Sequence, residues 1–384
     1  MANRKDSKGR VLKVGESQRK DGTYMYRYTD TRGKRQSVYA SDLKELREKE
    51  KVIHKNLDDG IDYAAGKITV LELVYRYLSL KKNIQESTAE TYKVSTNRLS
   101  KFDFAYMKIV DVKASDAQKW ISELCNSGLK YGSIQSVLTI VKPAFMMAYN
   151  EDIIRRYPFS FRISDFLQND STVREPLTLV QQNGLLAFIK NTAPWYKHYD
   201  LINVLLGTGM RISEFLGLTI NDIDFNNNRI FINKQLVRGS DKKPHIKTTK
   251  TAYGVRYIPM TTQVSNSLKK LIEKSQKSNI VNIVDGCHGF IALKSNGRIM
   301  ERCEIDHIFT RLKKAYNDTN PAVPIKMLTP HVLRHTFCTN MVNAGMDIKS
   351  LQYLMGHASV KMTLNVYAHA SYENVAANMR AIAT

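Results

Sequence analysis

The sequence has few cysteines, and their spacing gives no reason to pair them. Its 384 residues include four, Cys125, Cys287, Cys303 and Cys338, which lie far apart and form no CxxC motif. A zinc ribbon and a disulfide framework both need closely spaced cysteines, so neither is a good interpretation. We therefore expect reduced thiols in a cytoplasmic protein.

Other missing features narrow the range of functions. No stretch approaches the roughly 20 apolar residues that a membrane-spanning helix needs, and the opening MANRKDSKGR has no apolar signal core. We expect neither export nor a membrane partner. The chain also lacks a GxxxxGK[ST] phosphate loop, so the usual signature of nucleotide hydrolysis is missing.

Acidic residues are too few to balance the basic ones. The chain holds 58 Lys and Arg against 36 Asp and Glu, a formal net charge of +22. This excess favours a polyanionic partner, with nucleic acid ahead of an anionic membrane surface. A protein that uses its charge only for solubility is the alternative. The length and the 43% hydrophobic content suffice for two or three domains with ordinary cores.

Residues 1–62 are expected to form a small domain with a three-stranded sheet. The strand-like runs RVLKVGE, TYMYRYTD and KRQSVYA are separated by the turn sequences RKDG and TRGK. Tyr24, Tyr26 and Tyr28 recur at every second position, the period of a sheet with two different faces.

A helix should follow this sheet, with Asp42 as N-cap and Glu45 completing a capping box. Residues 1–35 hold eleven Lys and Arg against four Asp and Glu. A small basic sheet backed by one helix could lie along a DNA groove. A solvated surface sheet is the alternative.

Residues 66–165 are expected to form an all-helical bundle. Capping boxes predict three helix starts, at Thr69 with Glu72, Ser87 with Glu90, and Ser115 with Gln118. A fourth helix should begin near Ser133 and be kinked at Pro143. Its predicted inner side consists of Val137, Leu138, Val141, Phe145 and Tyr149. Nothing in this segment suggests chemistry.

Residues 175–384 are expected to form a mainly helical domain with a small antiparallel sheet. DIDFNNNRIFINKQLV is typical of a hairpin that turns at Asn226 to Asn228, and GVRYIPM predicts a third strand after a polar loop. MLTPHVLRHTF should begin a helix with Thr329 as N-cap and Pro330 at its first position. The predicted fold class is therefore mixed α+β.

Chemically versatile residues gather near the C-terminus, and a metal site is one interpretation of them. His331 and His335 are four residues apart and could share a helix face as zinc ligands do. No glutamate follows His331, however, and Arg334 between the two histidines would repel a cation. We predict no metal and no cofactor.

A phosphate site is the stronger interpretation. His331 and Arg334 lie near the N-terminus of the predicted helix, where free N–H groups and the helix dipole favour an anion. Arg211, just after a glycine turn, offers a second guanidinium. Two guanidiniums can neutralise a phosphoryl transition state without Mg²⁺. For Arg211 taken alone, a surface ion pair is the alternative.

A tyrosine completes this chemistry as a nucleophile. A phenol with the ordinary pKa of about 10 becomes a usable phenolate beside two arginines and a histidine. Tyr367, ten residues after His357, is the candidate among twenty tyrosines, with Tyr353 and Tyr372 as alternatives.

Four ordered segments, TGMRISEFLGL, HVLRH, LMGHAS and LNVYAH, resemble the tyrosine recombinase (phage integrase) family. The two upstream segments are similar in layout to integrases of phages and conjugative transposons. The resemblance implies an arm-site-binding domain at 1–62, a helical core-binding domain at 66–165 and a catalytic domain at 175–384.

The resemblance also implies a role for each site residue. Tyr367 becomes the nucleophile that forms a 3′-phosphotyrosyl bond, and Arg211 and Arg334 become the clamp on the scissile phosphate. His331 becomes a proton-handling partner of the tyrosine, and His357 a contact to the phosphate or the nucleophile.

Two further roles follow from the resemblance. Glu214 matches an acidic position that supports the site, whereas His335 is left outside it. A lysine on the hairpin loop is implied as general acid for the 5′-hydroxyl leaving group. Lys250 is the predicted residue, and the alternatives are Lys247, Lys242 and Lys243.

We therefore expect a site-specific recombinase that integrates and excises a mobile element. The implied partners are double-stranded DNA at core and arm sites, a homo-tetramer on two duplexes, an excisionase and a host DNA-bending protein. The tail SYENVAANMRAIAT should dock on a neighbouring protomer or fold back on its own chain. A type IB topoisomerase and a non-catalytic DNA-binding regulator are the alternatives.

Overall fold

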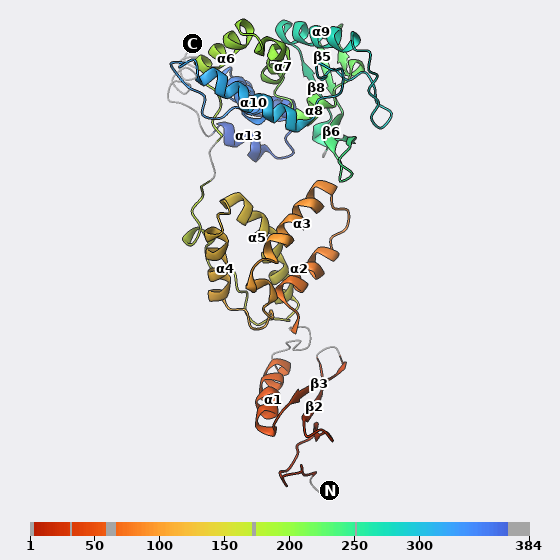
Figure 1. The fold of residues 1–384 in the computed structure, drawn as a ribbon, viewed down its shortest axis with the longest axis vertical. Coiled ribbons are helices and arrows are strands. Elements are labelled where there is room, and N and C mark those ends of the chain that lie inside the picture. Colours follow the sequence, from red (N-terminus) through yellow and green to blue (C-terminus); the bar gives the residue numbers. More distant parts are fainter. Residues whose placement is uncertain (1–3, 31–32, 59–66, 171–173, 250–251, 368–384) are drawn as a thin grey trace. The chain divides into compact units, whose positions relative to one another are not determined.

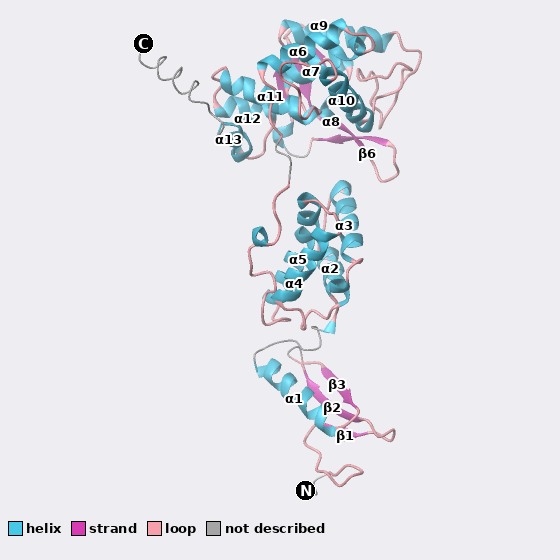
Figure 2. Cartoon of the chain, turned by 60° about the vertical axis from the view of Figure 1, so that its left-hand side comes forward, coloured by secondary structure: helices cyan, strands magenta, loops and turns pink. Residues whose placement is uncertain are grey.

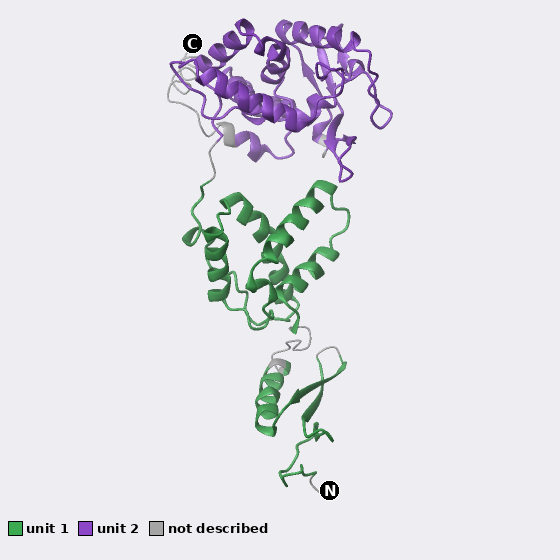
Figure 3. Cartoon of the chain, in the orientation of Figure 1, with its two compact units in different colours: residues 1–172 green, residues 173–384 purple. Residues whose placement is uncertain are grey.

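The computed structural model describes residues 4–30, 33–58, 67–170, 174–249 and 252–367 (Figure 1). Within these ranges the side chains of 56, 58, 252 and 365–367 lie outside the description. Figure 2 shows helices making up most of the chain after the first sheet. The chain divides into two compact units, residues 1–172 and 173–384 (Figure 3).

Unit 1 begins with an antiparallel sheet in the order β1-β2-β3. Its strands are β1 (Glu16–Gln18), β2 (Tyr24–Thr29) and β3 (Arg35–Ala40), and helix α1 (Leu43–Asp58) follows. The predicted alternation is confirmed, because Tyr24, Tyr26 and Tyr28 are all buried in one core with apolar residues of α1.

Two details of this region differ from the prediction. The run RVLKVGE is not a strand over its length, since Gly15 has φ +90° and β1 begins only at Glu16. Asp42 caps α1 as predicted, with Oδ1 accepting from the N–H of Lys44 and of Glu45. The Glu45 carboxylate, however, accepts from Ser41 at 3.2 Å, one residue before the expected partner.

The rest of unit 1 is a helical bundle, as predicted. Its helices are α2 (Val70–Ser79), α3 (Glu86–Leu99), α4 (Ala114–Asn126) and α5 (Tyr131–Asn150), with 3₁₀ turns η2 (Asp103–Tyr106) and η3 (Ile163–Asp165). The core contains Trp120 stacked on Phe104, with ring centroids 4.5 Å apart. Pro143 lies inside α5, and Tyr149 at its end is exposed rather than inward-facing.

Of the three predicted capping boxes, only the first forms. Thr69 and Glu72 cap α2 reciprocally. Helix α3 already begins at Glu86, so the predicted cap Ser87 lies in its first turn. At α4 the carboxylate of Asp116 accepts from the N–H of Lys113 at 2.8 Å, so the helix begins before Ser115.

Unit 2 is mainly helical. Its helical elements are α6 (Leu179–Asn191), η4 (Trp195–His198), α7 (Tyr199–Thr208), α8 (Ile212–Leu216), η5 (Ile220–Asp222), η6 (Ala252–Gly254), α9 (Thr262–Gln276), α10 (Arg302–Asn317), α11 (Pro330–Asn343), α12 (Ile348–Met355) and α13 (Val360–Tyr367). Thr329 caps α11 as predicted, because its hydroxyl accepts from the N–H of Val332 and Pro330 is the first helical residue.

In the part of unit 2 that the structure describes, two small antiparallel sheets interrupt these helices. The predicted hairpin and third strand form the sheet β4-β5-β8, made of β4 (Ile223–Asp224), β5 (Arg229–Ile232) and β8 (Arg256–Pro259). The expected polar loop contains a second hairpin, β6 (Lys234–Arg238) with β7 (Pro244–Thr248). Both of its strands are largely half-buried or exposed. They therefore lack the alternation of apolar and polar residues by which a strand can be predicted from the sequence.

The predicted fold class, mixed α+β, is confirmed. A continuous core of unit 2 runs through its helices and through the sheet β4-β5-β8, which fixes the ends of α7, α8, α11 and α12 relative to one another. None of the helices in the described part of the chain has the length and apolar character that a bilayer span requires.

Phe145→Ala should destabilise the helical bundle by about 3–5 kcal/mol, because it removes a fully buried ring that lies 6.4 Å from Phe104. The chain has two tryptophans, so in a Trp195→Phe background the fluorescence of Trp120 reports urea unfolding of this bundle alone. The control Met146→Ala changes an exposed neighbour and should cost less than about 0.5 kcal/mol. Equal losses in the two variants would contradict this packing.

Candidate active site

Two left-handed glycine turns shape the site. Gly209 ends α7 with φ +61°, and a Cβ there would lie 2.2 Å from the Phe337 ring. Gly356 ends α12 with φ +60°, and a Cβ there would lie 2.9 Å from Nη1 of Arg256. Both positions need glycine for conformation and for space. The first turn carries the chain directly to Arg211, the N-cap of α8.

Arg211 and Arg334 reach neighbouring carbonyl groups at the end of α12. Arg334, on α11, is 6% exposed; its Nη1 donates to the Gly209 carbonyl at 2.7 Å and its Nη2 to the Met355 carbonyl. Nη2 of Arg211 donates to the Gly356 carbonyl at 2.8 Å. Two guanidiniums, distant in sequence, are therefore held at one turn.

Glu214 joins this pair to a third arginine. The Glu214 carboxylate is 2% exposed and accepts from Nη1 of Arg211 at 2.7 Å and from Nη2 of Arg256 at 2.9 Å. Burial acts to raise the pKa of Glu214, but the hydrogen bond from Arg256 and the charges of both arginines lower it overall. Glu214 is therefore ionised, and its charge is fully compensated.

The site carries more positive than negative charge. Three guanidiniums face one carboxylate among the described side chains, which leaves an excess of two positive charges. Burial and the neighbouring Arg211 lower the pKa of Arg334 to about 9, so this guanidinium is still charged at neutral pH. Like charges at this depth repel, and an anion beside them would be strongly stabilised.

His357 follows the glycine turn and links α12 to α13. It is 7% exposed, and its Nδ1 lies 3.1 Å from Oγ1 of Thr363 on α13. Burial, followed by the charges of Arg334 and Arg211, lowers the pKa of His357 to about 4. The imidazole is therefore neutral near pH 7 and can either donate or accept a hydrogen bond.

His331 lies at the rim of this cluster. It is exposed in the first turn of α11, and partial burial followed by the charges of Arg174 and Arg334 lowers its pKa. His335, which the sequence analysis left outside the site, is half-buried further along α11.

The remaining predicted residues are only partly described. Tyr367 is the last residue of α13, and its side chain lies outside the described residues, as does all of Lys250. The alternative lysines are exposed, with Lys247 on β7 and with Lys242 and Lys243 in the turn before it. The described residues include no group of three or more His, Cys, Asp or Glu side chains that could hold a metal ion.

Arg256 also belongs to this cluster, although it was not predicted from the sequence as a site residue. This residue lies on β8 and is 1% exposed; its Nε donates to the Leu354 carbonyl at 2.7 Å and its Nη1 to the Gly254 carbonyl at 2.9 Å. One signal was available: Arg256 alternates with exposed neighbours and shares the buried face of β8 with Ile258. A charged residue at an inward strand position indicates a buried partner.

Two family models match this chain. The model of the phage integrase family matches residues 176–374, and the model of the DNA-binding domain of Tn916 integrase matches residues 1–57. The chain belongs to the phage integrase family. It is a site-specific tyrosine recombinase, an enzyme that cleaves and rejoins DNA, and it binds DNA.

Relatives resemble this recombinase along nearly its whole length. It is 37% identical over 390 aligned residues to the transposase from transposon Tn916 of Enterococcus faecalis, which covers 98% of this chain and 96% of that protein. The transposase from transposon Tn1545 of Streptococcus agalactiae shows the same identity and shares. A solved structure of the Tn1549 transposon integrase in complex with a circular intermediate DNA has a TM-score of 0.76 at 38% identity, covering 82% of this chain and 99% of that one.

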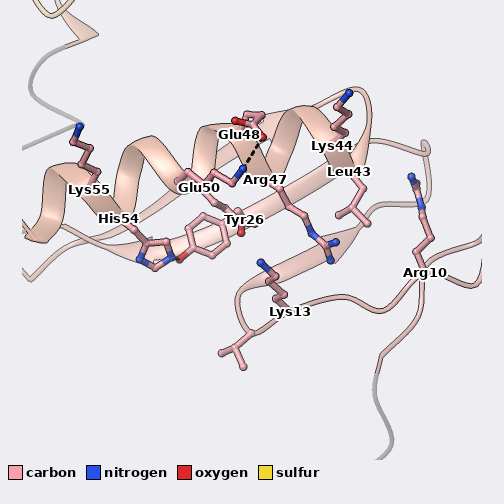
Figure 4. A pocket seen from close by; sticks show the side chains of 12 residues that line it. Arg10, Lys13, Tyr26, Leu43, Lys44, Arg47, Glu48, Glu50, His54 and Lys55 are labelled. Atoms are coloured by element: carbon pink, nitrogen blue, oxygen red, sulfur yellow. Dashed lines mark hydrogen bonds and ion pairs between the residues drawn. The ribbon is translucent and has the colours of Figure 1, made fainter.

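The N-terminal region of the recombinase carries a basic groove of about 750 Å³ (Figure 4). Lys44, Arg47, Lys51 and Lys55 of α1 form part of its lining together with residues of the segment before β1. Arg47 ties that segment to the helix, since its Nη2 donates to the Val11 carbonyl at 2.8 Å. The groove therefore lies within the part of the chain that the DNA-binding model matches.

The stability of unit 2 should depend on pH through His357. An unfolded chain has the ordinary histidine pKa of about 6.5, whereas the folded pKa is about 4. As pH falls through this window, the unfolded chain takes up the proton first, so stability present at neutral pH is lost. Between pH 6.5 and 4, the melting temperature of the wild type should fall further than that of His357→Gln, by about 5–10 °C.

Differential scanning calorimetry across this pH range makes the comparison. His288→Gln changes an exposed histidine of the same unit, and its melting temperature should depend on pH as that of the wild type does. If the wild type and His357→Gln lose stability in parallel, His357 is not the group that resists protonation.

Proposed function

We propose that this recombinase integrates and excises a transposon through a covalent 3′-phosphotyrosyl DNA intermediate. Transposon right-end DNA and circular intermediate DNA are the DNAs bound in the structures of the 38%-identical Tn1549 integrase, and we infer the same substrate class for this chain. The observation that carries the mechanism is the convergence of Arg211 and Arg334 on the adjacent carbonyls of Met355 and Gly356.

The two arginines bind the scissile phosphate in this mechanism. A guanidinium has five N–H donors, and the hydrogen bonds above occupy two side-chain donors of Arg334 and two of Arg211. Arg211 is 37% exposed, so its remaining donors are accessible to DNA. The excess of two positive charges matches a diester that gains a second negative charge when a phenolate attacks it.

Tyr367 is the proposed nucleophile. Thr363 and Tyr367 are four residues apart on α13 and therefore lie on one face of that helix. Thr363 contacts His357, which lies near the charges of Arg334 and Arg211, and the spacing of four residues from Thr363 supports the choice of Tyr367. By contrast, the hydroxyl of Tyr353 on α12 accepts a hydrogen bond from the Tyr257 N–H of the neighbouring sheet.

The proposed reaction exchanges one ester for another. The Tyr367 oxygen bonds to phosphorus as the bond from phosphorus to the 5′-oxygen breaks; His331 accepts the phenol proton, and Lys250 gives a proton to the leaving oxygen. A 5′-hydroxyl of the partner strand later reverses these steps. One phosphoester replaces another, so the bond energy is conserved and no ATP is consumed. Glu214 supports Arg211, and His357 contacts the phosphate or the nucleophile.

Three domains divide the remaining tasks in this proposal. Residues 1–62 bind arm sites through the basic sheet and groove, residues 66–165 bind the core site, and residues 175–384 perform catalysis. Four copies act on two duplexes in the bacterial cytoplasm, and an excisionase and a host DNA-bending protein are the proposed accessory partners. The large positive charge supports the DNA-binding roles.

Tyr367→Phe should abolish the covalent adduct, because the substitution removes the attacking oxygen. A nicked suicide substrate carrying the transposon end traps the adduct, and a denaturing gel separates it from free protein. Tyr353→Phe is the matched control and should retain adduct formation within about threefold. An adduct that persists in Tyr367→Phe would exclude Tyr367 as the nucleophile, and relaxation of plasmids without a transposon end would indicate a topoisomerase.

Lys250→Ala should slow cleavage by about 10²–10⁴-fold, because the leaving 5′-oxygen loses its proton donor. A substrate with sulfur in place of that bridging oxygen should restore the rate, since a thiolate leaves without protonation. Lys243→Ala and Lys247→Ala, on the β6–β7 hairpin, should cleave the ordinary substrate normally. A Lys250→Ala defect that is equally large on the sulfur substrate would remove Lys250 from the acid role.

A further inference from the structure

We propose that Arg256 is a positioning residue for recombination: it fixes the two phosphate-binding arginines and the His357 turn in one arrangement. This inference rests on the proposed function. Arg256 contacts neither the phosphate nor the nucleophile in the mechanism above, and it acts through Glu214 and the end of α12.

Stability alone gives little reason for an arginine at this position. Arg256 occupies the inward face of β8 beside Ile258, and its side chain is completely removed from solvent. Burying a guanidinium is costly even when it is paired, and apolar side chains of similar volume often replace buried ion pairs without loss of stability. What an apolar side chain could not supply is a set of directed hydrogen bonds.

Those hydrogen bonds join three separate segments. Two reach the Glu214 carboxylate on α8, at 2.9 and 3.2 Å, and Glu214 in turn holds Arg211. One reaches the Leu354 carbonyl in the last turn of α12, and one the Gly254 carbonyl at the end of η6. One rigid guanidinium therefore sets the distance between α8 and the C-terminal end of α12.

The distance between α8 and the end of α12 matters because the end of α12 carries the carbonyls that orient the two phosphate-binding arginines. Leu354 directly precedes Met355 and Gly356, whose carbonyls accept from Arg334 and Arg211. The Gly356 turn passes so close to Arg256 that a Cβ would lie 3.1 Å from its Cζ atom. A shift of the Arg256 guanidinium would therefore move both phosphate-binding groups and the adjoining His357 together.

Lysine cannot reproduce this geometry. An ammonium is a point donor without the planar fork that spans a carboxylate and two carbonyls at once. Arg256→Lys therefore keeps the positive charge but loses the set of hydrogen bonds to Glu214, Leu354 and Gly254. In single-turnover reactions on the nicked suicide substrate, it should form the covalent adduct roughly 100-fold more slowly. The dissociation constant for the same DNA should change less than about twofold, because the many phosphate contacts made elsewhere in the chain supply most of the affinity.

Arg229→Lys is the matched control. Arg229 lies on the adjacent strand β5, is exposed and pairs with Asp224 at 3.0 Å. This variant should keep both the rate and the affinity. A wild-type rate of adduct formation in Arg256→Lys would overturn the inference.

A neutral substrate separates positioning from simple loss of folding. When a methylphosphonate replaces the scissile diester, the transition state carries one negative charge fewer and depends less on the guanidinium pair. The rate ratio of wild type to Arg256→Lys should therefore shrink at least tenfold on this substrate. An unchanged ratio would mean that Arg256 does not act through Arg211 and Arg334.

Circular dichroism establishes that each variant is folded before its rate is compared. Should Arg256→Lys not fold, the paired variant Glu214→Gln with Arg256→Gln removes both buried charges and takes its place in the same assays. A paired variant that reacts at the wild-type rate would overturn the inference. If the wild-type protein itself forms no adduct, the proposed function is refuted. The hydrogen bonds of Arg256 would then have no role in recombination.

Discussion

One buried carboxylate determines the charge of this site. Glu214 is shared by Arg211 and Arg256, and it is the acidic group among the described residues that compensates a cluster of three guanidiniums. Without Glu214, three cations would face each other at low dielectric, which would cost a large part of the stability of an ordinary fold. With Glu214 in place the repulsion is reduced but not removed. The site is therefore stable enough to fold and remains attractive to a polyanion.

The polypeptide brings these charges together through the ends of its helices. Arg211 follows the Gly209 turn, and the carbonyl that it contacts belongs to the Gly356 turn, 145 residues further along the chain. Helix ends and tight turns present unpaired backbone groups, and here carbonyls receive the arginine side chains. The guanidiniums are thereby oriented before any DNA arrives, which is the condition under which electrostatic stabilisation of a transition state is most effective.

The sequence predicts the features of this molecule that depend on local chemistry. The tyrosine alternation of β2, the Thr329 cap and the arginines that follow or begin helices all have signals within a few residues, and the structure agrees with them. The second hairpin, β6–β7, has no such signal because its strands are polar and half-exposed. The inward position of Arg256 on β8 indicates a buried partner, but that partner, Glu214, lies 42 residues away and has no local signal that links the two.

In the proposed mechanism, Arg211 and Arg334 bind one and the same phosphate. The most direct measurement is a crystal structure of Tyr367→Phe bound to uncut transposon-end DNA. We expect both guanidiniums to donate to non-bridging oxygens of the scissile phosphate, at about 2.7–2.9 Å. A scissile phosphate bound elsewhere, with the two arginines contacting only protein groups or different phosphates, would contradict it.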